Sequence, residues 1–270
     1  MERIADYELV RSLGQGNNGE FFLAVPPDRL PVDAEHVAVK VLSGPSSDDA
    51  FRRATRELRI FASVRSPYLV TLYDAGQEGG RFFYSMAYFP LGSLEAPARP
   101  LIRLEILRAI AHVSRAAHAL HEAGVVHRGI KPANILLEDD GAKLSDLGLA
   151  QLLTPGLSVT GIGPIESLEY VDPGTLRGDR PSRASDIWSL GATLHRALSG
   201  TGVYGDLSST DVGLAVRQVL TTPPGISESL PPSEVDLIAR CLDPDPAQRL
   251  PTAEALADEV EALAAAEASA

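Results

Sequence analysis

The sequence has little cysteine, no long apolar run and a shortage of basic residues. The single cysteine, Cys241, excludes an intrachain disulfide and is typical of a reducing compartment. It lies in the apolar run 237–242, so we expect a small buried hydrophobic side chain rather than a nucleophile. No apolar stretch approaches the roughly 18 residues of a membrane span, and the first residues lack the apolar centre of a secretory leader. We therefore expect a cytoplasmic protein with no membrane span in this chain.

Basic side chains are outnumbered, with 24 Lys and Arg against 36 Asp and Glu, for a formal net charge of −12. Binding to a phosphate backbone requires clustered Lys and Arg, so this balance predicts no nucleic-acid partner. A hydrophobic share of 44% excludes a wholly disordered or fibrous chain. The length of 270 residues fits one two-lobed domain or two small ones.

Two regions of different character follow one another along the chain. The first contains strand-like runs and one helical pattern, at 7–10, 20–25, 36–42, 49–64 (the helix), 68–73 and 81–87. The segment 92–100 is rich in helix breakers and is interpreted as a linker. Beyond it we predict helices and two short strands, at 102–122, 135–137 and 142–144 (the strands), 184–198, 211–220, 234–241 and 253–265.

Glycine residues are spaced in a phosphate-binding pattern at Gly14, Gly16 and Gly19. Glycine lets backbone N–H groups approach a phosphate without interference from a Cβ atom. The pattern lies between two strands rather than between a strand and a helix, which disfavours a dinucleotide fold. Alone, it is equally compatible with a flexible hairpin turn.

Charged residues at three later positions add chemistry to this turn. Lys40 is flanked by apolar residues on a predicted central strand and therefore requires a partner or a ligand. Glu57 lies on the next predicted helix; the alternative is an ordinary surface ion pair. Asn134 and Asp146, on either side of a predicted hairpin, offer two oxygen ligands suited to Mg²⁺.

In this order along the chain, these parts resemble a protein kinase domain of the Ser/Thr type common in bacteria. The resemblance covers about 7–265 and rests on several spaced motifs: the glycine turn, Lys40, Glu57, and the segments 127–137, 145–148, 185–191 and 241–249. It implies an α+β, two-lobed fold in a single domain over 1–270. The small antiparallel β N-lobe with one helix would span 1–91, and the larger, mainly α-helical C-lobe would span 92–266.

The resemblance also implies ATP and Mg²⁺ as cofactors, and a protein as substrate or partner. The implied ATP-binding positions are Leu13, Gly14, Gly16, Gly19, Ala38, Lys40, Glu57, Met86 and Leu136. Lys40 would hold the α- and β-phosphates and be oriented by Glu57, and Asn134 and Asp146 would bind the metal. Asp186 would hold the backbone of the segment 127–137.

The chain departs from the family at its catalytic base, because Gly129 stands where the family has aspartate. The loop residues Lys131 and Asn134 remain, and the nearest acids in sequence are Glu122 and Glu138. A general base contributes about 10²- to 10⁴-fold, whereas phosphoryl transfer depends mostly on positioning and metal electrostatics. No catalytic set is therefore intact, and whether the chain is an enzyme stays open.

Further departures concern a buried pair and the adenine pocket. The family's Ala-Pro-Glu is replaced by residues 172–174, Asp-Pro-Gly, which removes the glutamate expected to pair with Arg249. We expect that pair to be lost unless Asp172 or Asp179 substitutes, and an unpartnered buried arginine is costly. Phe21 occupies a position where the family prefers valine, so its ring would either stack on adenine or fill the pocket.

Thr160 lies in the predicted activation loop and is a candidate regulatory phosphosite with Arg128 as phosphate partner. The alternative is an ordinary solvated loop threonine.

Three functions fit these residues. The favoured one is a pseudokinase that binds ATP and Mg²⁺ and acts as a scaffold or allosteric signalling partner. The second is a weakly active Ser/Thr kinase, and the third is an interaction module that has lost nucleotide binding, with Phe21 in the adenine site.

Overall fold

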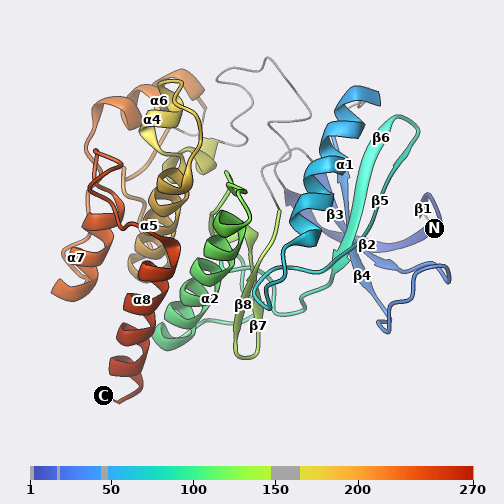
Figure 1. Ribbon diagram of the computed structural model, residues 1–270, viewed down its shortest axis with the longest axis horizontal. Coiled ribbons are helices and arrows are strands. Elements are labelled where there is room, and N and C mark those ends of the chain that lie inside the picture. Colours follow the sequence, from blue (N-terminus) through green and yellow to red (C-terminus); the bar gives the residue numbers. More distant parts are fainter. Residues whose placement is uncertain (1–2, 17–18, 44–47, 147–164, 209, 270) are drawn as a thin grey trace.

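The chain folds into two lobes, one built on an antiparallel sheet and one built on helices (Figure 1). The computed structural model describes residues 3–16, 19–43, 48–146, 165–208 and 210–269. The α+β, two-lobed fold expected from the sequence is therefore confirmed.

The N-terminal lobe is a six-stranded sheet in the order β1-β2-β3-β4-β6-β5, with one helix against it. Its elements are β1 (Arg3–Ile4), β2 (Tyr7–Gly16), β3 (Gly19–Val25), β4 (Val37–Leu42), α1 (Asp48–Ser63), β5 (Leu72–Glu78) and β6 (Arg81–Ala87). The strand predicted at 68–73 is wrong in its bounds, because β5 begins at Leu72. The backbone at Tyr68 and Val70 instead bonds Leu144 of the other lobe, at 2.8 and 3.1 Å.

Strand β4 is buried along its whole length, and its two faces join different cores. Val37, Val39 and Val41 pack on the outer side of the sheet. Ala38 and Leu42 pack on the side that faces the second lobe. Because strand side chains alternate between faces, Lys40 projects to the same side as Ala38 and Leu42.

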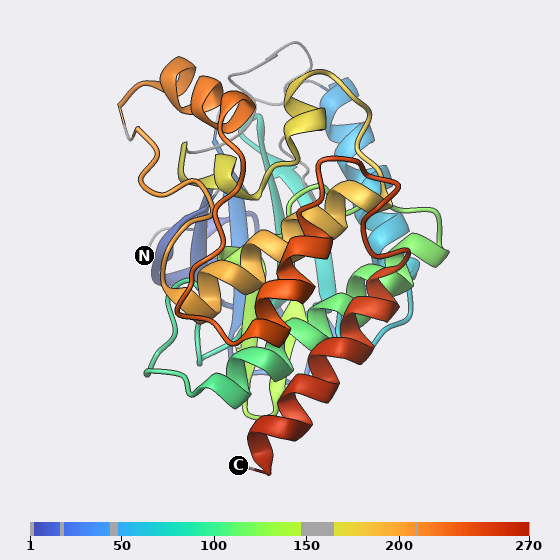
Figure 2. The ribbon, with the colours of Figure 1, turned by 90° about the vertical axis from the view of Figure 1, so that its left-hand side faces the viewer.

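The C-terminal lobe consists of helices and a short β-hairpin. Its described elements are α2 (Arg103–Glu122), η1 (Pro132–Asn134), β7 (Ile135–Glu138), β8 (Gly141–Leu144), η3 (Ile165–Tyr170), α4 (Pro173–Leu176), α5 (Arg183–Ser199), α6 (Val212–Thr221), α7 (Pro232–Cys241) and α8 (Ala253–Ala268). The predicted helices and the two short strands are confirmed, with bounds shifted by a few residues. Helix α8 runs beside α2 in both ribbon views (Figure 2).

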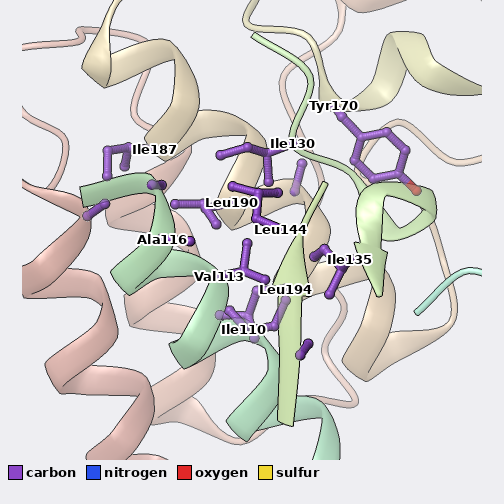
Figure 3. Packing of buried hydrophobic residues seen from close by; sticks show 14 of the residues in the cluster. Ile110, Val113, Ala116, Ile130, Ile135, Leu144, Tyr170, Ile187, Leu190 and Leu194 are labelled. Atoms are coloured by element: carbon purple, nitrogen blue, oxygen red, sulfur yellow. The ribbon is translucent and has the colours of Figure 1, made fainter. Parts of the chain in front are cut away.

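The core of this lobe lies between α2, α5 and the β7–β8 hairpin (Figure 3). Ile110 and Val113 of α2 lie near Leu144 of β8 and Leu194 of α5 in this view. Cys241 is fully buried, as expected, and burial raises the pKa of its thiol to about 12, which disfavours the thiolate form. Within the described parts of the chain, no helix is both long and apolar enough to cross a membrane.

Local signals explain the bounds of helix α5, which carries Asp186. The Ser182 hydroxyl accepts a hydrogen bond from the Ser185 backbone N–H at 3.3 Å, which caps the first turn. Gly200 ends the helix with φ 74°, a left-handed conformation that glycine adopts without a Cβ penalty.

Candidate functional site

A cleft of about 810 Å³ is lined by residues from both lobes. Among the positions predicted to bind ATP, five line it: Leu13, Gly14, Ala38, Met86 and Leu136. Lys131 and Asn134 line the same cleft from the second lobe. The fold thus gathers positions that are widely separated in sequence around one space.

The glycine turn joins β2 to β3 at one end of the cleft, where Gly16 pairs with Gly19. Gly14 has φ 122° beside a β-bulge, a backbone conformation that other residues rarely adopt. A Cβ atom on Gly19 would lie 2.4 Å from the Val41 carbonyl oxygen, so a side chain there would push β3 away from β4. Both glycines are therefore required by the sheet itself.

Apolar side chains form the walls of the cleft. Ala38 on β4 lies directly opposite Met86 on β6, and Leu136 comes from β7. Phe21 also lines the cleft, and the Lys40 Nζ lies 4.9 Å from its ring centroid, a cation–π distance. The ring thus packs against Lys40, and the cleft keeps its volume beside it.

Lys40 forms its ion pair with Asp146, whose Oδ2 accepts from the lysine ammonium. The Tyr84 hydroxyl donates to Oδ1 of the same carboxylate at 2.8 Å. Lys40 and Tyr84 are 2% and 1% exposed, so this is a buried charged cluster. Burial, followed by the nearby Asp146 charge, raises the pKa of Tyr84 well above its usual value, which keeps the hydroxyl protonated as a donor.

In this structure Lys40 pairs with Asp146 and not with Glu57, the partner that the resemblance implies. Among the described residues, Lys40 pairs with Asp146, and Glu57 on α1 makes no ion pair. Glu57 is partly exposed, so water can solvate its carboxylate. The physical reason is that a buried ammonium favours a buried counter-charge, and Asp146 supplies one without α1 having to approach.

Sequence reasoning missed Tyr84. It lies on β6 directly opposite Lys40, and residues opposite one another in an antiparallel pair project to the same face. The available signal was a phenol in an apolar strand, two residues before Met86, because a buried tyrosine hydroxyl usually finds a polar partner.

Asp186 on α5 holds the backbone that precedes Gly129, as expected. Its carboxylate accepts from the backbone N–H groups of His127 at 2.8 Å and Arg128 at 3.0 Å, and it lies 2.8 Å from Nε2 of His121. Arg128 has φ 66°, and these bonds fix its left-handed backbone. The loop is therefore rigidly held even though position 129 carries no side chain.

Two other residues of this loop make side-chain hydrogen bonds, one to Gly129 and one to a residue outside the loop. The Asn134 amide donates to the Gly129 carbonyl at 2.7 Å, and the Lys131 ammonium donates to the Ser167 hydroxyl at 2.9 Å. The two nearest acids in sequence have other partners, because Glu122 pairs with Arg183 at 3.0 Å and Glu138 with Lys143 at 3.5 Å.

Asn134 and Asp146 are the residues that would hold a metal ion. They flank the open end of the β7–β8 hairpin, where the Ser145 backbone N–H bonds the Asn134 carbonyl at 2.9 Å. The bond to Gly129 uses the Asn134 amide nitrogen and leaves its side-chain oxygen for a ligand. No described group of three or more His, Cys, Asp or Glu side chains forms a metal site. One carboxylate and one amide oxygen fit Mg²⁺, which usually takes few protein ligands beside substrate phosphates.

Glu169 is a further acid that lines the cleft. Its residue is 6% exposed, and its nearest basic group, Arg196, lies 3.8 Å away. Burial raises the pKa of this carboxyl. A carboxyl with a raised pKa beside the cleft is a candidate proton acceptor.

The sequence left open whether Asp172 or Asp179 pairs with Arg249, and the structure selects Asp172, which takes the place of the missing glutamate. Its carboxylate accepts from Arg249 at 2.6 and 3.3 Å, with both side chains buried. Arg249 also donates to the carbonyls of Ala184 and Asp243, each at 2.8 Å. The alternative partner, Asp179, is exposed.

The candidate phosphosite Thr160 lies outside the described residues. Its expected phosphate partner, Arg128, is exposed.

Comparison with known proteins gives one consistent result. A family model described as "Protein kinase domain" matches residues 7–260. The chain is 32% identical over 262 residues to serine/threonine-protein kinase PknJ of Mycobacterium tuberculosis, and the matched region covers 92% of this chain and 44% of PknJ. It is 34% identical over 266 residues to PknK of the same species, covering 95% of this chain and 23% of PknK. It is 31% identical over 259 residues to the probable serine/threonine-protein kinase PkwA of Thermomonospora curvata, and the matched region covers 94% of this chain and 34% of PkwA. The chain thus spans less than half the length of these relatives.

Proposed function

Because the chain belongs to the protein kinase family, we propose that it is a pseudokinase domain that binds ATP with Mg²⁺ and signals through protein contacts. The observation that carries this proposal is Gly129, a missing carboxylate in a loop whose other bonds are intact. Such a loop can still place Asn134 and Asp146 for a metal. It has no group at position 129 to accept the proton of a substrate hydroxyl.

We propose the following roles for the residues of the cleft. Leu13, Ala38, Met86 and Leu136 would contact adenine, the glycine turn and Lys40 would contact the phosphates, and Asn134 and Asp146 would hold Mg²⁺. Bound Mg²⁺ would neutralise charge on the phosphates. For Lys40 to reach the phosphates, its ammonium must leave Asp146, and Glu57 then remains a candidate partner for it.

The division of the chain is also part of this proposal. We place the N-lobe at 1–91 and the C-lobe at 92–266 of one domain, supported by a buried core that includes residues of both lobes. The partner would be a protein, and a nucleic acid is disfavoured by the net charge of −12.

Binding and phosphotransfer should be measured side by side on the wild type and on Gly129→Asp. We expect ATP with Mg²⁺ to raise the stability of the wild type, by about 2.7 kcal/mol at a hundredfold excess over Kd. We expect no transfer of labelled γ-phosphate by the wild type and measurable transfer by Gly129→Asp, because a general base contributes about 10²- to 10⁴-fold. Gly129→Asp with Asp146→Ala is the inactive control. Equal transfer by the wild type and Gly129→Asp, at a rate above that of the inactive control, would contradict the pseudokinase assignment.

A weakly active Ser/Thr kinase is the second candidate, and Glu169 favours it. This carboxyl lines the same cleft as Lys131 and Asn134 and has a raised pKa. If it replaces the missing base, the wild type should transfer phosphate slowly and Glu169→Gln should abolish the transfer. A wild type that binds no nucleotide would instead support the interaction module.

A further inference from the structure

Tyr84 is a buried residue of β6 two positions before Met86, which lines the cleft, yet no role in nucleotide binding follows from its position in the sequence. Its side chain is 1% exposed and projects to the same face of the sheet as Lys40, its cross-strand neighbour. Both side chains end on one group, the Asp146 carboxylate. Tyr84 therefore contacts a proposed metal ligand without contacting the cleft opening.

Both oxygens of Asp146 are used by donors from the sheet. Oδ1 accepts from the Tyr84 hydroxyl at 2.8 Å, and Oδ2 accepts from the Lys40 ammonium. Hydrogen bonds to an ionised carboxylate are roughly twice as strong as neutral ones. Asp146 also has φ 59°, so its backbone adopts a restricted conformation while the side chain is held at both ends.

Mg²⁺ on Asp146 would compete with these donors for the same electron density. A metal ion withdraws charge from the carboxylate oxygens and weakens every hydrogen bond that they accept. Coupling between two ligands of one group is reciprocal, so a bond that metal weakens must in turn weaken metal binding. The Lys40 ammonium can move to the nucleotide phosphates, whereas the Tyr84 ring is packed in the core and has no second acceptor described.

We propose that Tyr84 is a positioning residue that holds the Asp146 carboxylate in its metal-free arrangement and lowers the affinity of this site for Mg²⁺ with nucleotide. This inference rests on the proposed function, since it requires that Asp146 be a metal ligand. It makes Tyr84 the residue that sets how strongly nucleotide binding depends on magnesium.

The test is isothermal titration calorimetry of ATP with excess Mg²⁺ and with EDTA, on the wild type and Tyr84→Phe. The Kd for ATP with EDTA divided by the Kd for ATP with Mg²⁺ is a ratio that measures the magnesium contribution alone. We expect Tyr84→Phe to increase that ratio roughly five- to tenfold, the effect of one net hydrogen bond, and to leave the metal-free Kd within about twofold. A change in packing alone would move both constants together and leave the ratio unchanged.

Tyr7→Phe is the matched control. Tyr7 is also a buried tyrosine of the sheet, and its hydroxyl donates to a carboxylate, that of Asp74, at 3.1 Å. It packs in the core on the other side of the sheet, so its ratio should equal that of the wild type. An unchanged or reduced ratio in Tyr84→Phe, with nucleotide bound, overturns the inference and leaves the proposed function standing. Absence of nucleotide binding in all three proteins refutes both.

Discussion

Asp172→Asn removes the negative charge beside a buried arginine while it keeps nearly the same shape. Asp172 and Arg249 are 7% and 5% exposed and are joined at 2.6 and 3.3 Å. The Arg249 guanidinium also lies 5.0 Å from the ring centroid of Trp188. Asparagine is as good an N-cap as aspartate, so the bond to the Gly174 N–H at the start of α4 should survive. The substitution therefore isolates the charge.

Removing one partner of a buried ion pair costs about 3–5 kcal/mol, because the other charge stays buried without compensation. The carbonyls of Ala184 and Asp243 still accept from Arg249, and the new amide can accept as well, so we expect the lower end, about 3 kcal/mol. At roughly 2–4 °C per kcal/mol for a chain near this size, the melting temperature should fall by roughly 6–12 °C. Urea unfolding measures the free energy directly and should show an unchanged m value.

The control for this prediction is Asp179→Asn. Asp179 is near in sequence and exposed, so its substitution should change stability by less than about 0.5 kcal/mol. Combining Asp172→Asn with Arg249→Met should give an effect well below the sum of the two, because each removes the same pair. If Asp172→Asn costs no more than Asp179→Asn, the reasoning that Asp172 replaces the missing glutamate is refuted.

Substitutions at three further positions test other parts of the fold by unfolding measurements. Gly200→Ala should cost about 1–2 kcal/mol because φ is 74°, and Gly200→Asn should cost less. Burial lowers the pKa of His195, whose Nε2 accepts from the Ser227 N–H at 2.9 Å. The stabilising contribution of this neutral histidine is therefore present above the unfolded pKa near 6.5 and is lost as the pH falls below that value. His195→Gln should flatten the dependence of the free energy of unfolding on pH in this range, and an unchanged dependence would contradict this. Burial raises the pKa of Tyr7 from 10.0 to about 12, so its contribution is complete below pH 10 and is lost as pH rises from 10 to 12; Tyr7→Phe should reduce that alkaline loss.

Most of the candidate site was predictable because its residues follow one another in a fixed order along the chain. Ala38 and Met86 come from strands that the alternating pattern identified, and the structure places them opposite one another. Asn134 and Asp146 flank the hairpin whose strands were predicted from short apolar runs. In these cases the local pattern determines the element, and the element determines where the side chain projects.

Pairings across the molecule were not predictable in the same way. The sequence offered Lys40 an acid on α1, but the structure pairs it with Asp146. It offered Arg249 two candidate acids, and burial selects Asp172 over the exposed Asp179. Which acid meets a given base depends on distance and desolvation between elements, and neither quantity is encoded in the spacing along the chain.

The sequence by itself determined the two-lobed α+β fold, the positions around the cleft and the absence of a carboxylate at Gly129. The helices and strands follow from local periodicity and the missing carboxylate from residue type, whereas the two lobes and the cleft positions follow from the spaced motifs that resemble the protein kinase family. Tertiary structure alone decided that Asp172 compensates Arg249 and that Tyr84 and Lys40 share the Asp146 carboxylate. Those contacts join segments far apart in the chain, and they form because a buried charge must find its counter-charge and its donors wherever the packing places them.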